Sequence, residues 1–99
     1  MEEPDNVYDQ GARETVELGN RIADSAPDSN LSEVAEGLLA GAIQYWLYAH
    51  QPCGDPDCQE CKPLCTGELR LDALRNAVEE FARSSEYFHT PGDFDAGRA

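Results

Sequence analysis

Basic residues are scarce in this 99-residue sequence. Seven Lys and Arg stand against 20 Asp and Glu, which gives a formal net charge of −13. Nucleic-acid binding depends on cationic side chains that neutralise phosphates, so an ordinary basic nucleic-acid interface is excluded. Acidic residues are spread along the whole chain and Lys62 is the only lysine. We therefore expect adaptation to molar salt, as in a halophilic archaeon or its virus, where a Debye length of about 3 Å screens the repulsion.

Long hydrophobic runs are also missing. The most apolar stretch, residues 38–49, is 12 residues long, whereas a helix needs about 20 to span a bilayer. The first ten residues, MEEPDNVYDQ, are acidic and contain no apolar run, so they do not resemble a secretory signal. We expect a cytoplasmic protein with no membrane contact, whose thiols are reduced.

Motifs typical of enzymes are lacking as well. The sequence contains no glycine-rich phosphate loop and no recognisable arrangement around a serine or cysteine nucleophile. Adjacent acidic residues are common in a chain this acidic, so they do not indicate a general acid and base. We expect a protein that is not an enzyme.

No stretch alternates apolar and polar residues as a half-buried strand would, and the apolar spacing instead predicts three helices. The first is expected near 10–26, where Pro27 ends it. The second begins after Asn30, with Glu33 three residues later as in a capping box, and Pro52 limits it to about residue 50. The third begins after Thr66 and runs to about Phe88. The predicted fold is a single all-α domain over residues 1–99, with loose ends at 1–5 and 90–99.

The second predicted helix is apolar on nearly all sides. Between residues 38 and 49 only Gln44 is polar, and Gly37 and Gly41 lie one turn apart, where another backbone could approach closely. A helix of this kind is central in a bundle or shared with a partner. We expect a protein partner, or self-association, at this helix.

The loop between the second and third helices concentrates metal-binding side chains. The spacing H-x2-C-x4-C-x2-C-x3-C places five of them in 16 residues, namely His50, Cys53, Cys58, Cys61 and Cys65. Reduced, clustered cysteines favour a metal over disulfides, and Zn²⁺ takes four nitrogen or sulfur ligands in structural sites. The sequence therefore predicts a zinc-binding loop over 50–66, with the turn supplied by Gly54 and by residues 55–56. Its general similarity to a zinc knuckle is confined to residues 50–65 and implies no function.

Five candidates compete for four positions. With the three central cysteines fixed, the fourth ligand is His50 or Cys65. An all-cysteine site carries a charge of −2 and a site with one histidine −1, so His50 is narrowly favoured in a chain this acidic. Cys65 precedes the third helix, whose N-terminal amides favour a thiolate.

Two further interpretations remain open. The opening spacing C-x4-C-x2-C also occurs in plant-type ferredoxins, so a [2Fe–2S] electron carrier is an alternative to Zn²⁺. Three short helices can also form a nucleic-acid-binding transcriptional regulator, although the arginines of the third helix are interleaved with acids. The preferred hypothesis is a small, non-enzymatic, zinc-stabilised helical protein that binds another protein as a regulatory or assembly module.

Overall fold

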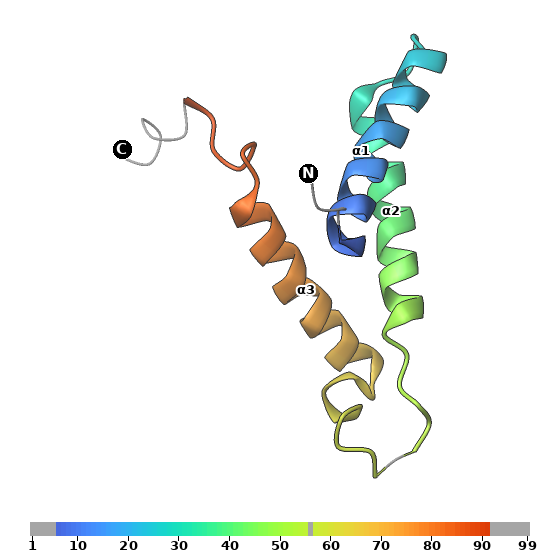
Figure 1. Ribbon diagram of the computed structural model, residues 1–99, viewed down its shortest axis with the longest axis vertical. Helices are drawn as coiled ribbons and strands as arrows, with labels where there is room; N and C mark the ends of the chain where they lie inside the picture. Colours follow the sequence, from blue (N-terminus) through green and yellow to red (C-terminus); the bar gives the residue numbers. More distant parts are fainter. Residues whose placement is uncertain (1–5, 56, 92–99) are drawn as a thin grey trace, which may run out of the picture. The chain divides into compact units, whose positions relative to one another are not determined.

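The computed structural model describes residues 6–55 and 57–91, and over those ranges its regular structure consists of helices, with no strand (Figure 1). The elements follow in the order α1 (Val7–Ser25), α2 (Leu31–Ala49), the short 3-10 turn η1 (Lys62–Leu64) and α3 (Gly67–Ser84). The all-α prediction, with a cysteine loop between the second and third helices, is confirmed. The predicted loose ends fall mostly on residues 1–5 and 92–99, outside the described ranges.

The chain divides into two compact units, Met1–Trp46 and Leu47–Ala99. The first unit contains α1 and most of α2, and the second contains the cysteine loop and α3. That the whole chain forms one domain stays a prediction, and the two units are described separately below.

Helix α1 begins three residues earlier than expected because of a cap that the sequence analysis did not use. The Asn6 side-chain oxygen accepts a hydrogen bond from the Asp9 backbone N–H at 2.8 Å. Such a cap satisfies one of the amides left open at a helix start and stabilises the helix by about 1 kcal/mol. This offsets the poor helix propensity of Gly11.

Helix α2 has the predicted bounds. The Asn30 side chain accepts a hydrogen bond from the Ser32 N–H at 2.8 Å and caps its start. At the other end, the Gln51 side-chain amide donates to the Leu47 carbonyl at 3.0 Å. Pro52 then prevents continuation, since the residue before a proline avoids helical dihedral angles. None of the helices in the described ranges is long and apolar enough to cross a lipid bilayer.

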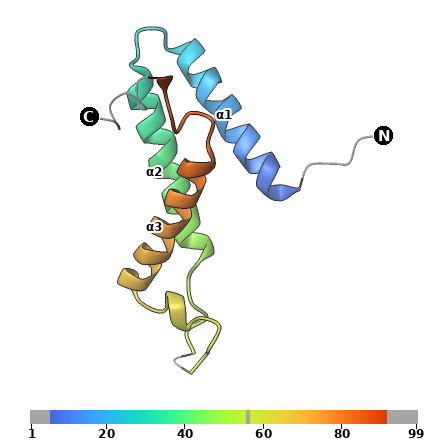
Figure 2. The ribbon, with the colours of Figure 1, turned by 90° about the vertical axis from the view of Figure 1, so that its left-hand side faces the viewer.

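In the first unit, α1 and α2 form an antiparallel hairpin (Figure 2). Gly19 is the only buried residue of α1, and a Cβ built there would lie 2.8 Å from Leu38 Cδ1 of α2. The absence of a side chain at residue 19 therefore permits the close approach of the two helices. A groove of about 580 Å³ between them is lined by residues of both, including Leu18, Ile22 and Val34.

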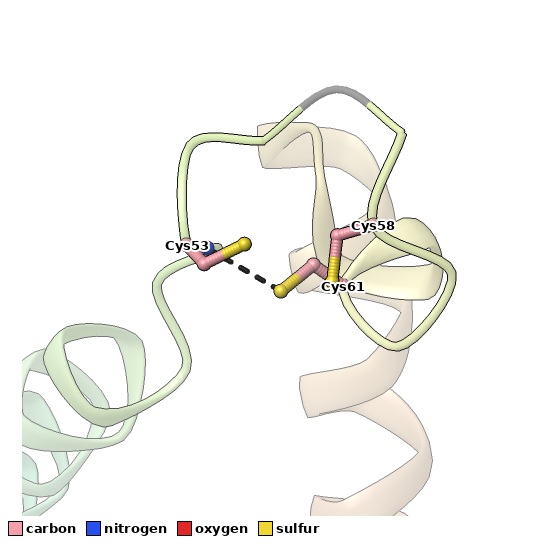
Figure 3. A group of neighbouring side chains, drawn as sticks. All are labelled: Cys53, Cys58 and Cys61. Atoms are coloured by element: carbon pink, nitrogen blue, oxygen red, sulfur yellow. Dashed lines mark hydrogen bonds between the residues drawn. The ribbon is translucent and has the colours of Figure 1, made fainter.

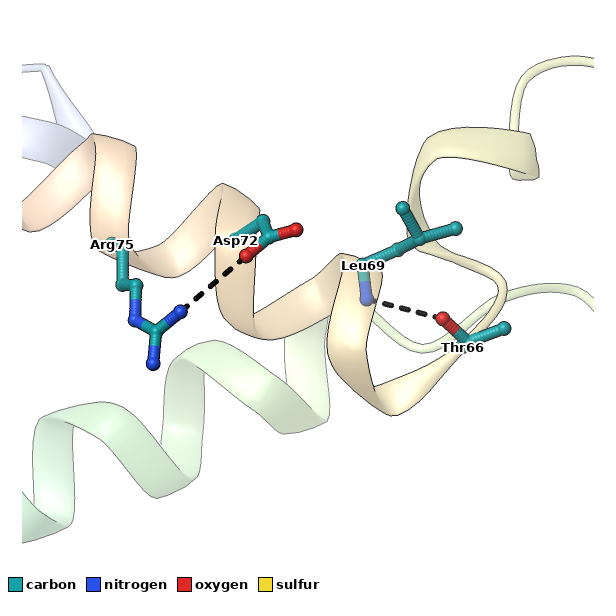
Figure 4. A network of polar contacts seen from close by, with 4 residues as sticks. All are labelled: Thr66, Leu69, Asp72 and Arg75. Carbon is teal, nitrogen blue, oxygen red and sulfur yellow. Dashed lines mark hydrogen bonds and ion pairs between the residues drawn. The ribbon is translucent and has the colours of Figure 1, made fainter.

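In the second unit, Thr66 caps α3 as predicted. Its hydroxyl oxygen accepts a hydrogen bond from the Leu69 N–H at 3.1 Å (Figure 4). One turn further on, Arg75 forms an ion pair with Asp72 at 3.5 Å, and both side chains are more than 60% exposed. Such exposed pairs contribute little stability. Leu74, on the apolar face of α3, is 8% exposed and is the only buried hydrophobic residue in the described part of the chain.

Helix α3 ends at Ser84, four residues before the predicted end. Ser85 leaves the helix with an extended conformation (φ −76°, ψ 140°). Its side-chain oxygen accepts a hydrogen bond from the Tyr87 N–H at 3.1 Å, and its carbonyl accepts one from the Phe88 N–H at 3.1 Å. Serine competes in this way with helical hydrogen bonding. The apolar spacing that continues to Phe88 therefore does not correspond to helix.

The contact at Gly19 predicts opposite effects for the same substitution at two positions in α1. Gly19→Val would displace Leu38 and should lower stability by about 1 kcal/mol, because overpacking outweighs the better helix propensity. Gly11→Val, where a Cβ meets nothing within 4 Å, should raise stability by a few tenths of a kcal/mol. Urea unfolding followed by circular dichroism measures both. Equal effects of the two variants would contradict the close helix contact.

Candidate metal centre

The site lies in the connection between α2 and α3, within the second unit. The Sγ atoms of Cys53, Cys58 and Cys61 all lie within 4.8 Å of one another, and Figure 3 shows the three side chains converging. Cys53 follows the end of α2, whereas Cys58 and Cys61 precede η1. The structure thus brings together three of the five ligands expected from the sequence.

Gly54 and Asp55 contribute to the predicted turn between Cys53 and Cys58, whereas residue 56, the other part of that prediction, lies outside the described residues. Gly54 has φ +94°, the only positive φ in the described residues, and this conformation strains any residue with a Cβ. The Asp55 carbonyl accepts a hydrogen bond from the Cys58 N–H at 3.1 Å, and its side chain accepts one from the Asp57 N–H at 2.9 Å. These hydrogen bonds direct the chain so that Cys58 Sγ lies close to Cys53 Sγ.

Backbone amides also orient the sulfurs. The Cys53 N–H donates to Cys61 Sγ at 3.3 Å across the loop (Figure 3). The Cys61 backbone amide, aided by hydrogen bonds with the side chains of Cys61 and Cys53, holds the pKa of the Cys58 thiol below its ordinary value.

The pKa of the Cys61 thiol is shifted in the opposite direction. Its hydrogen bond from the Cys53 amide favours the thiolate, but contacts with the Cys53 and Cys58 side chains and partial desolvation outweigh it, so the pKa of Cys61 is raised. The pKa values of the neighbouring Cys58 and Cys61 thiols are therefore shifted in opposite directions. A soft cation bound here would replace the thiol protons, since metal binding to thiols releases protons.

The arrangement fits a single metal ion. Zinc–sulfur bonds of about 2.3 Å in a tetrahedron place ligand sulfurs about 3.8 Å apart, so contraction by at most about 1 Å would bring these sulfurs into range. The thiolates of a [2Fe–2S] cluster are divided between two separate irons, which requires a wider set. Three mutually close sulfurs are compatible with metal binding.

His50 and Cys65 are not part of this three-sulfur group. His50 is half-buried at the end of α2, where its N–H donates to the Leu47 carbonyl at 3.3 Å. Cys65 is exposed and follows η1 directly. The choice between these two residues as fourth ligand stays a prediction.

Arg70 joins the site to α3, a role that the sequence analysis did not identify. Its Nη1 atom donates to the Leu64 carbonyl at 2.9 Å, and the contact is partly buried. The bond fixes η1 against the first turns of α3. No sequence pattern distinguishes Arg70 from Arg75 or Arg83, because all three are interleaved with acids; only the fold of the turn places a carbonyl within reach of Arg70.

Comparison of the chain with protein-family models, with curated protein sequences and with solved structures finds no match. The functional argument therefore rests on the residues of the site and on the surfaces of the helices.

Removal of the Arg70 donor should weaken metal binding. Arg70→Met keeps the bulk of the side chain but leaves the Leu64 carbonyl without this donor, a loss of about 1 kcal/mol that corresponds to about fivefold in zinc affinity. Arg75→Met removes an exposed ion pair and should leave the affinity unchanged. Competition with a chromophoric chelator measures both variants, and equal affinities would show that η1 does not depend on Arg70.

Proposed function

We propose that this chain is a small, non-enzymatic helical module that binds one Zn²⁺ ion through the cysteine loop and uses its helices to bind another protein in a regulatory or assembly role. The observation that carries the proposal is the group of three sulfurs within 4.8 Å of one another. A metal there would clamp the end of α2 to the start of α3. In small domains the binding energy of a structural zinc ion contributes directly to folding.

Zinc is favoured over iron by the site's compactness and by the surrounding turns. A second metal centre would need further ligands spread around the three sulfurs, and the turn at Gly54 holds these sulfurs around one point instead. An iron–sulfur preparation would absorb visible light, whereas a zinc protein is colourless. Metal analysis therefore separates the two interpretations at once.

Exposed apolar side chains on α1 and α2 support a protein-binding role. Leu31 is 72% exposed and Leu39 is 48% exposed on α2, and Val16 is 63% exposed on α1. No hydrophobic side chain in the described part of the first unit is buried. Apolar surface of this kind is typical of a site that another protein covers, and α2 carries no charged residue after Glu36.

A nucleic-acid-binding role is less well supported by α3. Arg75 and Arg83 lie beside Asp72 and Glu79, at 3.5 and 3.9 Å respectively. These pairs reduce the positive charge that phosphate binding would require. We also propose that the protein works in a cytoplasm of molar salt, because its acidity suits that environment.

Loss of one central sulfur should remove the metal and much of the stability. We expect the purified wild type to contain one zinc ion per chain and Cys58→Ser to contain none under the same chelator challenge. The midpoint of thermal unfolding should fall by more than 5 °C, since a loss of about 1 kcal/mol lowers it by about 4–8 °C in a domain of this size. Atomic emission and circular dichroism provide the two measurements.

Gln59→Ala is the matched control, because Gln59 is exposed in the same loop and offers no sulfur. It should keep the metal and the unfolding midpoint of the wild type. If Cys58→Ser behaves like this control, the metal clamp is refuted; a coloured, iron-containing wild type would replace it with the electron carrier.

The protein-binding surface is tested by an exposed leucine on α2. Leu39→Gln should weaken retention of a partner from cells that express the chain by about tenfold, because a buried leucine contributes about 1.5 kcal/mol or more at an interface. Val7→Gln, at an 87% exposed position at the start of α1, should have no effect. Quantitative cross-linking mass spectrometry compares the variants. Identical partners at identical yield for both would contradict a surface on α2, and recovery of the chain itself would indicate self-association.

A further inference from the structure

The three-sulfur group leaves one position of a zinc tetrahedron to be filled. We infer that Cys65, and not His50, is the fourth ligand, and that it reaches the site when η1 rewinds from a 3-10 turn to an α-helical turn. This inference rests on the proposed zinc site and specifies how that site closes.

Cys61 and Cys65 bracket η1 as its N-cap and C-cap. In a 3-10 helix each residue advances by 120°, so residues four apart lie about 120° apart around the axis. In an α-helix the advance is 100° per residue, and the same two residues lie about 40° apart on one face. Rewinding therefore turns Cys65 toward the side of Cys61.

The separation of Cys61 and Cys65 along the helix axis also decreases on rewinding. Four residues rise about 8 Å in a 3-10 helix and about 6 Å in an α-helix. The rewound turn thus brings the two cysteines about 2 Å closer along the axis as well as onto the same face. Both changes favour a shared ion.

The backbone is close to the required conformation. Cys61 has φ −87° and ψ −10°, and Cys65 has φ −77° and ψ −13°, both in the right-handed helical region. A change of about 30° in ψ brings such residues to α-helical values. No residue of the turn has to adopt a positive φ.

The hydrogen bonds of η1 permit this change. The Cys65 N–H donates to the Lys62 carbonyl over 3.4 Å, longer than the usual 2.9–3.0 Å. In an α-turn the same N–H would donate to the Cys61 carbonyl, which now accepts from the Leu64 N–H at 2.8 Å. Rewinding would thus exchange the long Cys65 bond for one to the Cys61 carbonyl, and the Leu64 N–H would donate to the carbonyl of residue 60 in place of its present bond.

The route from His50 is less direct. Between His50 and Cys53 the chain passes through Gln51 and Pro52, and the proline disfavours helical dihedral angles at Gln51. Residues 51 and 52 lie outside α2, so a rewinding that brought His50 toward Cys53 would have to pass through the proline. The turn before α3, by contrast, already has helical dihedral angles at both Cys61 and Cys65.

Cobalt-loaded full-length protein tests the inference, because sulfur-to-cobalt charge-transfer absorption counts the bound thiolates. Cys65→Ser should lose about one quarter of this absorption, one of four sulfur bonds, and its cobalt affinity should fall tenfold or more. His50→Ala should keep the spectrum and the affinity of the wild type. Cys53→Ser is the positive control for loss of a ligand.

The outcomes distinguish failure of the Cys65 assignment from failure of the proposed metal site. If His50→Ala changes the spectrum and Cys65→Ser does not, or if neither changes it, the inference is overturned while the zinc module stands. A wild type that binds no cobalt and no zinc refutes both.

A second measurement needs no variant and therefore holds even if Cys65→Ser does not fold. In the wild type, zinc should protect Cys65 from iodoacetamide to the same extent as Cys58, as read by peptide mass spectrometry. Alkylation of Cys65 at an unchanged rate in the presence of zinc overturns the inference.

Discussion

The shortage of buried apolar surface constrains this protein more than any other feature. Leu74 is the one hydrophobic side chain buried in the described residues, and each apolar side chain left in water forgoes about 1.5–3 kcal/mol of stabilisation. The net charge of −13 adds repulsion. Stability must then draw on other sources, and the clustered sulfurs and the exposed helix faces are two that the described residues offer.

These two sources lie in different units. The sulfurs belong to the second unit, where the loop, η1 and α3 are tied by Arg70 and capped by Thr66. The exposed leucines of α2 belong to the first, whose helices meet closely at Gly19. A metal would stabilise the loop region, and a partner would cover the hairpin, so the proposed module needs both.

Local signals made most of the fold predictable. Asn30, Thr66 and Pro52 set helix limits by interactions within four residues, and the structure keeps those limits. The missed boundaries also have local causes. Asn6 provides a cap and Ser85 provides a competing turn, and in both cases a short polar side chain decided the boundary while the apolar spacing suggested another.

The site was predictable as a set of residues but not as a geometry. Spacing alone indicated five candidate ligands, and the structure brings three of them together, Cys53, Cys58 and Cys61, where a C-x2-C turn and a glycine turn act locally. The contact of Arg70 with the Leu64 carbonyl depends on how a 3-10 turn meets a helix, and sequence spacing contains no signal for it. The positions of His50 and Cys65 depend on the same backbone details.

The hydrogen bond from the Cys53 amide to Cys61 Sγ has a consequence for the order of folding. It closes a segment of only nine residues, and a loop of that length closes in about 10–100 ns with a small entropic cost. The sulfurs can therefore meet before any helix finds its neighbour. An ion captured at that moment would hold the start of α3 in place, so that the helix grows from an anchored end and avoids part of the unfavourable nucleation step that isolated helices face.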